Sequence, residues 1–147
     1  MVHDREERDL ERELRDWLAG WGREVAGEDF AAASKRFASD VIGYGTKATV
    51  ARGLDALRAE QWRAVWPNID GFAFDSDGAD VWVAGDGLMG IIAARWDSLG
   101  RRADGSSFPR GGRATVVLQR ANRDDPWLGR HTHFSLEPVD PGTHVDG

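Results

Sequence analysis

The segment HTHFS places two histidines one residue apart, His131 and His133. On a β-strand, residues i and i+2 share a face, so both imidazoles would point the same way. Such a pair could ligate a metal, act as acid and base, or serve as hydrogen-bonded wall residues of a packed sheet. A metal site needs at least three protein ligands, and the other histidines, His3 and His144, lie near the ends of the chain. We therefore predict no metal site and keep the other two interpretations open.

Tyr44 and Arg113 are the next candidates for a chemical role. Tyr44 is the only tyrosine of the chain and its best hydroxyl donor. Arg113 and Thr115 fall on one face of a predicted strand, and an arginine inside a pocket would bind a carboxylate or phosphate through two parallel hydrogen bonds. At an exposed strand end, Arg113 would instead pair with an aspartate. If the protein is catalytic, Tyr44 with His131 or His133 would transfer protons, and Arg113 would hold an anionic ligand group.

Seven tryptophans are an unusual load for a chain of 147 residues. Each buries a large apolar area but must also satisfy one indole N–H. The set favours either a very aromatic core or a cavity with aromatic walls, and such a cavity would suit an apolar, planar ligand. The predicted ligand-binding residues are Trp17, Trp21, Trp62, Trp66, Trp96, Phe108, Arg113 and Thr115.

The elements that must position these residues begin with three helices. Apolar residues recur every three or four positions within residues 4–26, which predicts a long amphipathic helix. A shorter helix is predicted over residues 28–38. A third is predicted over residues 53–66, where a proline would stop it. A short strand at residues 40–45 separates the second helix from the third.

From residue 69 onward the apolar pattern alternates, which predicts β-strands. The strands are predicted at residues 69–76, 79–84, 88–98, 113–121 and 127–138. Residues 99–112 are polar and glycine-rich, and they are predicted to form a long connection. Helices followed by an antiparallel meander give an α+β plan, in which a twisted sheet can curl around the first helix and leave one open end.

Composition limits the class of protein. The length predicts one domain, residues 1–138, followed by a disordered tail at residues 139–147. Without cysteine, the chain can form neither a disulfide nor a thiolate site. A net charge of −6 argues against nucleic-acid binding, which depends on a positive field. No apolar run reaches the length of a membrane span or a signal-peptide core, so we expect a cytoplasmic protein without membrane contact.

Three stretches carry a resemblance to a known family: residues 37–75, residues 111–138 and the pair Arg95–Trp96. Together with the order of elements, they resemble the nuclear transport factor 2-like superfamily, in its SnoaL-like, ketosteroid-isomerase-like bacterial branch. The resemblance covers about residues 8–138. It implies a cystatin-like cone, with three N-terminal helices packed on a strongly curved antiparallel β-sheet, and a homodimer formed through the sheet. The same fold carries isomerases, cyclases, hydrolases and non-enzymatic binding domains, so it implies no single activity.

The residues that do chemistry in this family have few matches here. The carboxylate base of ketosteroid isomerases would stand at Gly45, which cannot abstract a proton. The position of their oxyanion-hole tyrosine offers Trp17 or Trp21, and the late-strand acid would fall in residues 113–119, which hold no carboxylate. The inner-wall aspartate of polyketide cyclases and the Asp–Arg–Asp set of limonene-epoxide hydrolases have no clear equivalent. Whether the protein is an enzyme therefore stays open; if it is one, the resemblance implies a cofactor-independent isomerase, cyclase or hydrolase.

Two functions from different classes follow. The first is a small-molecule-binding protein with a hydrophobic, cone-shaped pocket and no cofactor. Its ligand would be apolar or amphipathic and, if Arg113 points inward, anionic. The second is a non-catalytic ligand-sensing or protein-association domain of the same fold, which the missing carboxylate base favours. A cone filled by side chains would favour the second function, and a polar group pointing into an open cavity would favour the first.

Overall fold

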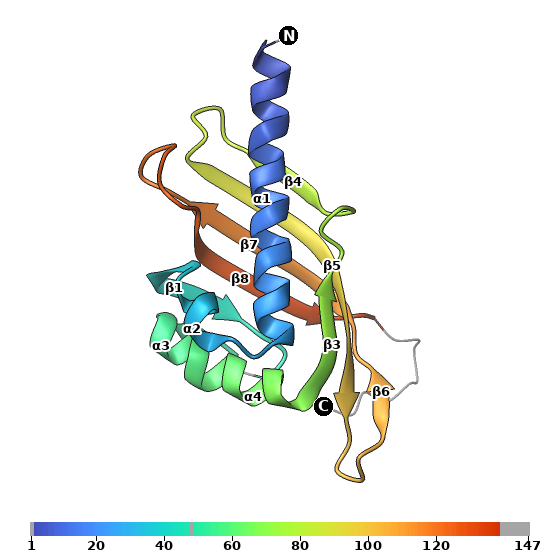
Figure 1. The fold of residues 1–147 in the computed structure, drawn as a ribbon. Coiled ribbons are helices and arrows are strands. Elements are labelled where there is room, and N and C mark those ends of the chain that lie inside the picture. Colours follow the sequence, from blue (N-terminus) through green and yellow to red (C-terminus); the bar gives the residue numbers. More distant parts are fainter. Residues whose placement is uncertain (1, 48, 139–147) are drawn as a thin grey trace.

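The computed structural model describes residues 2–47 and 49–138, so the predicted tail at residues 139–147 lies outside the described residues. Figure 1 shows one long helix lying across the concave side of a curved sheet, with short helices gathered at one end. This arrangement confirms the predicted α+β cone. Among the described residues, no helix is both long enough and apolar enough to cross a membrane.

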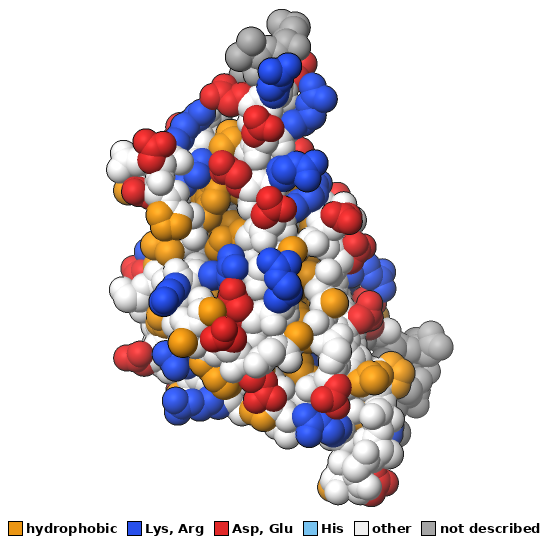
Figure 2. Space-filling model, viewed as in Figure 1, with side chains coloured by type: hydrophobic (Ala, Val, Ile, Leu, Met, Phe, Trp, Pro, Cys, Tyr) orange, Lys and Arg blue, Asp and Glu red, His pale blue; other side chains and the backbone are white. Residues whose placement is uncertain are grey.

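The long helix α1 spans Val2–Ala26, in agreement with the periodicity of the sequence. Its apolar stripe, which includes Leu14, Leu18 and Trp21, is buried. Its outer faces carry charges of both signs, as Figure 2 shows along the length of the helix. This division is typical of an amphipathic helix that covers a core. Hydrophobic side chains gather in the angle between α1 and the sheet (Figure 2).

The second helix, α2, is shorter than predicted and spans only Phe30–Ser34. Asp29 caps its N-terminus by accepting a hydrogen bond from the backbone N–H of Ala32 at 3.1 Å. The predicted helical residues near Phe37 belong instead to strand β1, Phe37–Tyr44, because that segment pairs with the last strand of the sheet. Pairing with a distant strand outweighs the local helical pattern here.

The third helical region is continuous but changes its winding. The segments are α3 (Leu54–Ala56), a π-helical turn (Leu57–Trp62), α4 (Arg63–Val65) and a 3₁₀ turn (Trp66–Asn68). π-Helical turns are rare and are frequent at functional sites. This one contains a buried polar residue, Gln61, next to the buried Trp62. One polar side chain therefore enters an otherwise apolar face of the helix.

Within residues 2–47 and 49–138, eight strands form one mixed sheet. They are β1 (Phe37–Tyr44), β2 (Ala51–Arg52), β3 (Ile69–Phe74), β4 (Asp80–Val83), β5 (Met89–Arg101), β6 (Ser107–Pro109), β7 (Gly112–Gln119) and β8 (Leu128–Leu136). The order is β2-β1-β8-β7-β5-β3, and both β4 and β6 pair with β5. The residues predicted as a long connection, 99–112, therefore hold the end of β5 and all of β6.

The direction of one strand pair differs from the prediction. Strands β1 and β8 run parallel, whereas the other pairs are antiparallel. The expected wholly antiparallel sheet is therefore corrected to a mixed one. The physical reason is connectivity: most of the chain separates β1 from β8, so no hairpin turn dictates their relative direction.

The core lies between α1 and the concave face of the sheet and is rich in aromatic rings. Trp21 is only 1% exposed, and its ring centroid lies 5.0, 5.4 and 5.6 Å from those of Phe37, Phe74 and Phe134. Tilted and edge-to-face pairs at such distances add to the stabilisation that burial provides. The aromatic-core interpretation is therefore correct for much of the set.

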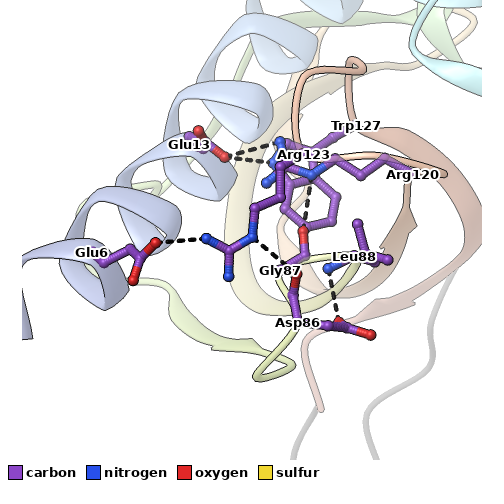
Figure 3. A network of polar contacts seen from close by, with 8 residues as sticks. All are labelled: Glu6, Glu13, Asp86, Gly87, Leu88, Arg120, Arg123 and Trp127. Carbon is purple, nitrogen blue, oxygen red and sulfur yellow. Dashed lines mark hydrogen bonds and ion pairs between the residues drawn. The ribbon is translucent and has the colours of Figure 1, made fainter. Parts of the chain in front are cut away.

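A polar network ties the N-terminal half of α1 to the sheet (Figure 3). Arg120, just after β7, holds its guanidinium 3.9 Å from the ring centroid of Trp127 and pairs with Glu13 of α1 at 3.3 Å. Arg123, in the turn between β7 and β8, pairs with Glu6 of α1 at 2.7 Å. These contacts fix the first half of α1, away from the short helices (Figure 1).

Candidate functional site

A cavity lies where the C-terminal end of α1 meets the third helical region and the sheet. Trp21 and Val25 of α1 line it, together with residues of the helical segment 61–66 and apolar side chains from β3, β5 and β8. Most of its polar groups come from residues 45–47, which follow β1, and from Arg110, which lies between β6 and β7. Its volume of about 50 Å³ has room for a few water molecules or for part of a small ligand.

Four of the predicted ligand-binding tryptophans line this cavity: Trp21, Trp62, Trp66 and Trp96. Trp62 and Trp66 stack with their ring planes 16° apart and their centroids 4.6 Å apart. Phe30 of α2 extends this stack, because its ring is nearly parallel to that of Trp66 at 5.1 Å. The cavity therefore has the aromatic wall that the tryptophan content predicted as one alternative.

Trp17 and Phe108 of the predicted set are placed elsewhere. Trp17 is buried in the core, with its ring 5.5 Å from that of Trp21. Phe108 lies on β6, where the guanidinium of Arg102 is 4.8 Å from its ring. Neither is among the residues that line the cavity.

Tyr44, His131 and His133 come together, but on the outer face of the sheet. The register of β1 and β8 places Tyr44 opposite His133, and the tyrosine ring lies 4.9 Å from the ring of His131 and 5.4 Å from that of His133. Nδ1 of His131 is 2.7 Å from the carbonyl oxygen of Ile42. Thr132 takes the inward position between the two histidines and is buried. The three residues thus lie across the sheet from the cavity, and a catalytic role for them stays a prediction.

Arg113 and Thr115 also lie on the outer face, so the expectation that they face the cone is corrected. Along β7 the buried positions are Ala114 and Val116, and strand alternation turns Arg113 and Thr115 outward. In the register of β7 and β8, Thr115 lies opposite His133. Arg113 therefore cannot hold an anionic group of a ligand inside the cone.

Arg110 takes the place predicted for Arg113. Its Nη2 donates a hydrogen bond to the hydroxyl oxygen of Thr46 at 2.5 Å, and its guanidinium lies 5.4 Å from the ring centroid of Trp96. Burial lowers the pKa of Arg110, because the charged guanidinium loses part of its hydration. No sequence signal singles out Arg110, because its position depends on the pairing of β6 with β5.

Gln61 is a second polar lining residue that the sequence analysis missed. Its Nε2 donates a hydrogen bond to the carbonyl oxygen of Gly43 at 2.9 Å. Gln61 stands four residues after Leu57, on the apolar stripe of the helix. A polar residue at such a position is the sequence signal that could have identified it. Lys47 lines the cavity too. Among the described residues, those that line the cavity include no aspartate, glutamate, histidine or tyrosine.

Comparison with known proteins identifies the fold. No family model and no curated protein matches the chain. A nuclear transport factor 2-like superfamily protein from Salmonella enterica matches with a TM-score of 0.73 and 14% identity, over 94% of this chain and 99% of that one. A ketosteroid isomerase-like protein from Erwinia carotovora atroseptica matches with 0.68 and 16%, over 81% and 89%. The association domain of CaMKII from C. elegans matches with 0.63 and 13%, over 91% and 98%. Identities this low show a shared fold alone.

Proposed function

For a chain with the nuclear transport factor 2-like fold, we propose that the cavity beneath the short helices binds a small molecule. The observation that carries the proposal is the composition of the lining, in which four tryptophans accompany a few polar side chains. Concave sites that are mostly aromatic or apolar, with a small number of polar groups to orient the ligand, are typical of small-molecule binding.

The size of the cavity limits the ligand. Its volume of about 50 Å³ is well below the roughly 300–1,000 Å³ of pockets that enclose drug-sized molecules. The cavity therefore excludes ligands larger than a single ring or a short chain. Because the space holds only part of such a ligand, side chains of the lining must shift to admit it.

The lining favours binding over proton transfer. General acid–base catalysis needs a suitable titratable group within hydrogen-bonding reach of the substrate. The polar side chains among the described lining residues are those of Thr46, Lys47, Gln61 and Arg110, and neither a carboxylate nor an imidazole accompanies them. An isomerase-type reaction in the cavity would have to use Lys47 as its acid or base, so it has less support than binding without chemistry.

A larger side chain at Val65 tests the proposal, because Val65 lines the cavity and is only half-buried. Val65→Phe is expected to occupy the space of the ligand and to weaken binding by roughly tenfold or more, about the effect of losing one good apolar contact. The measurement is isothermal titration calorimetry with three probes: benzoate, benzyl alcohol and hexanoate.

The matched control is Ala121→Phe, in the exposed turn between β7 and β8. This variant gains the same ring away from the cavity and should bind the probes as the native chain does. The cavity is not the site if the native chain binds none of the three probes, or if Val65→Phe binds them as tightly as Ala121→Phe.

A second function, self-association, is favoured by the outer face of the sheet. The strand register aligns a row of side chains across it: Trp82 of β4, Ile91 of β5, Val117 of β7, His131 of β8 and Ile42 of β1. Trp82 is 56% exposed, and Ile91 is exposed as well. Contiguous exposed apolar side chains mark interaction surfaces. We propose that a second copy of the chain covers this face, in a homodimer with the same row on both sides.

Ile91→Glu is expected to weaken the homodimer by roughly 100-fold, because an unpaired carboxylate buried in an apolar interface costs several kcal/mol. Sedimentation velocity would report the change from dimer to monomer. Val50→Glu, in the exposed loop between β1 and β2, introduces the same charge away from the sheet and should leave the dimer intact. A native chain that sediments as a monomer at its highest attainable concentration contradicts the homodimer.

A further inference from the structure

We propose that the cavity takes an aromatic carboxylate, with the carboxylate group bound by Arg110 and the ring placed among the lining tryptophans. This inference rests on the proposed function and names the chemical class of its ligand. Three features of the described residues carry it: a half-buried cation without a carboxylate partner, buried indole donors without acceptors, and a lining that holds aromatic planes but no anion.

Hydrogen bonds to Ser98 fix the backbone of Arg110, from which its side chain extends. The backbone N–H of Arg110 donates to the carbonyl oxygen of Ser98 at 2.9 Å, and its carbonyl oxygen accepts from the Ser98 hydroxyl at 2.6 Å. Both bonds fasten the residue to β5, whose Trp96 lies beside its guanidinium. The backbone of Arg110, between β6 and β7, is therefore anchored to the sheet, which defines the point from which its side chain extends.

Most N–H donors of the Arg110 guanidinium have no acceptor among the described residues. It carries five N–H groups, and among the described residues only Thr46 accepts a hydrogen bond from them. Two other arginines whose side chains are partly or almost wholly buried each have a carboxylate partner: Arg36 pairs with Glu24 at 2.6 Å, and Arg120 pairs with Glu13 at 3.3 Å. No carboxylate of the described residues forms an ion pair with Arg110.

A partly desolvated cation of this kind gains from an anion. Transferring a charge out of water is costly unless an opposite charge or several hydrogen bonds replace the hydration. The planar guanidinium matches a carboxylate best, because two parallel N–H groups can meet its two oxygens. Lys47 adds a second cationic side chain to the same lining.

Two lining tryptophans lack acceptors. The indole N–H groups of Trp21 and Trp96 are buried and have no hydrogen-bond partner among the described residues, and the same holds for Trp17, which does not line the cavity. A buried donor without an acceptor destabilises the fold by about 1–3 kcal/mol, so such groups are uncommon unless a ligand or water completes them. A ligand rich in acceptor oxygens and without N–H groups of its own fits this surplus of donors.

The apolar part of the ligand is a flat ring. Trp62 and Trp66 stack on each other with 16° between the planes and 4.6 Å between the centroids, and Phe72 stacks on Trp96 with 26° and 5.6 Å. All four rings line the cavity. Aromatic surfaces favour offset-stacked or edge-to-face contacts with another ring, which a saturated ring of the same size cannot make. The small volume restricts the ligand to one ring.

The test compares benzoate with benzamide, which has nearly the same shape but no charge, by isothermal titration calorimetry. We expect benzoate to bind at least roughly tenfold more tightly, the usual gain from a charge-assisted hydrogen bond. Arg110→Met should remove this preference and leave benzamide binding within about twofold. Arg113→Met is the matched control, because Arg113 lies three residues away on the outer face, and it should bind both probes as the native chain does.

One more variant and further ligands test the charge, the ring and the site separately. Arg110→Lys retains the charge but not the paired donors, and it should bind benzoate with intermediate affinity even if Arg110→Met fails to fold. Cyclohexanecarboxylate should bind more weakly than benzoate, and equal binding overturns the aromatic part of the inference. Equal binding of benzoate and benzamide by the native chain overturns the anionic part while the proposed small-molecule site stands. If neither these probes nor benzyl alcohol and hexanoate bind the native chain, the proposed function fails together with the inference.

Discussion

Replacing Trp21 with alanine is expected to lower the free energy of unfolding by about 3–5 kcal/mol, the usual cost of truncating a large, fully buried aromatic side chain. Trp21 is 1% exposed and packs against the rings of Phe37, Phe74 and Phe134. The variant would leave a void between α1 and the sheet, because close-packed neighbours cannot collapse into it without losing their own contacts. Urea unfolding followed by far-ultraviolet circular dichroism would measure the change.

The control for Trp21 is Trp82→Ala. Trp82 is 56% exposed on β4, so its truncation should change the unfolding free energy by no more than about 0.5 kcal/mol. Because Trp82 belongs to the proposed dimer face, both variants should be compared in the Ile91→Glu background, where that face is unpaired. Equal losses at Trp21 and Trp82 would show that α1 does not pack on the sheet as described.

Glu13→Ala is expected to lower the free energy of unfolding by about 1–3 kcal/mol, the range for leaving a buried polar group without its partner. One carboxylate oxygen of Glu13 accepts from the indole N–H of Trp127 at 2.9 Å and pairs with Arg120 at 3.3 Å (Figure 3). The side chain of Arg120 is 4% exposed, so water cannot readily replace the lost carboxylate. Thermal and urea unfolding would both report the loss.

The matched control is Glu6→Ala, because Glu6 lies on the same helix α1, nearer its N-terminus. Glu6 pairs with Arg123 at 2.7 Å, but both side chains are well exposed, at 54% and 43%. An exposed pair of this kind contributes about 0–1 kcal/mol, and salt screens it further. If Glu6→Ala destabilises the fold as much as Glu13→Ala, burial of Arg120 is not what gives the Glu13 contact its strength.

The sequence alone predicted α1 and most of the strands, because each depends on a local pattern. An apolar stripe with helical spacing can be buried only on one side of a helix, and α1 at Val2–Ala26 follows it. Alternation from residue 69 onward likewise required strands with one buried face. The tryptophan content also predicted an aromatic wall, and four of the predicted tryptophans line the cavity.

Contacts between distant segments decided what the local patterns could not. The second helix stops at Ser34 because Phe37–Tyr44 pairs with β8, far along the chain. A glycine-rich stretch contains β6 because β5 is long enough to offer it a partner. That pairing also carries Arg110 to the cavity, where the sequence had favoured Arg113. The sequence shows the charge and type of both arginines. It does not show which of the two side chains lies at the cavity.

A single extra residue in β8 decided which face of the sheet the two histidines occupy. The register of β7 and β8 shifts between Val117 and Leu118. Val117 lies opposite His131 and Leu118 lies opposite Gly129, so Arg130 of β8 has no partner on β7. Such a bulge reverses which alternate positions face the core. With Gly129 buried, an unbroken strand would have turned His131 and His133 into the cone. The sequence determined that the two imidazoles share a face, because strand alternation is local. Only the tertiary structure determined that this face is the outer one, because the bulge exists only in the pairing of two strands.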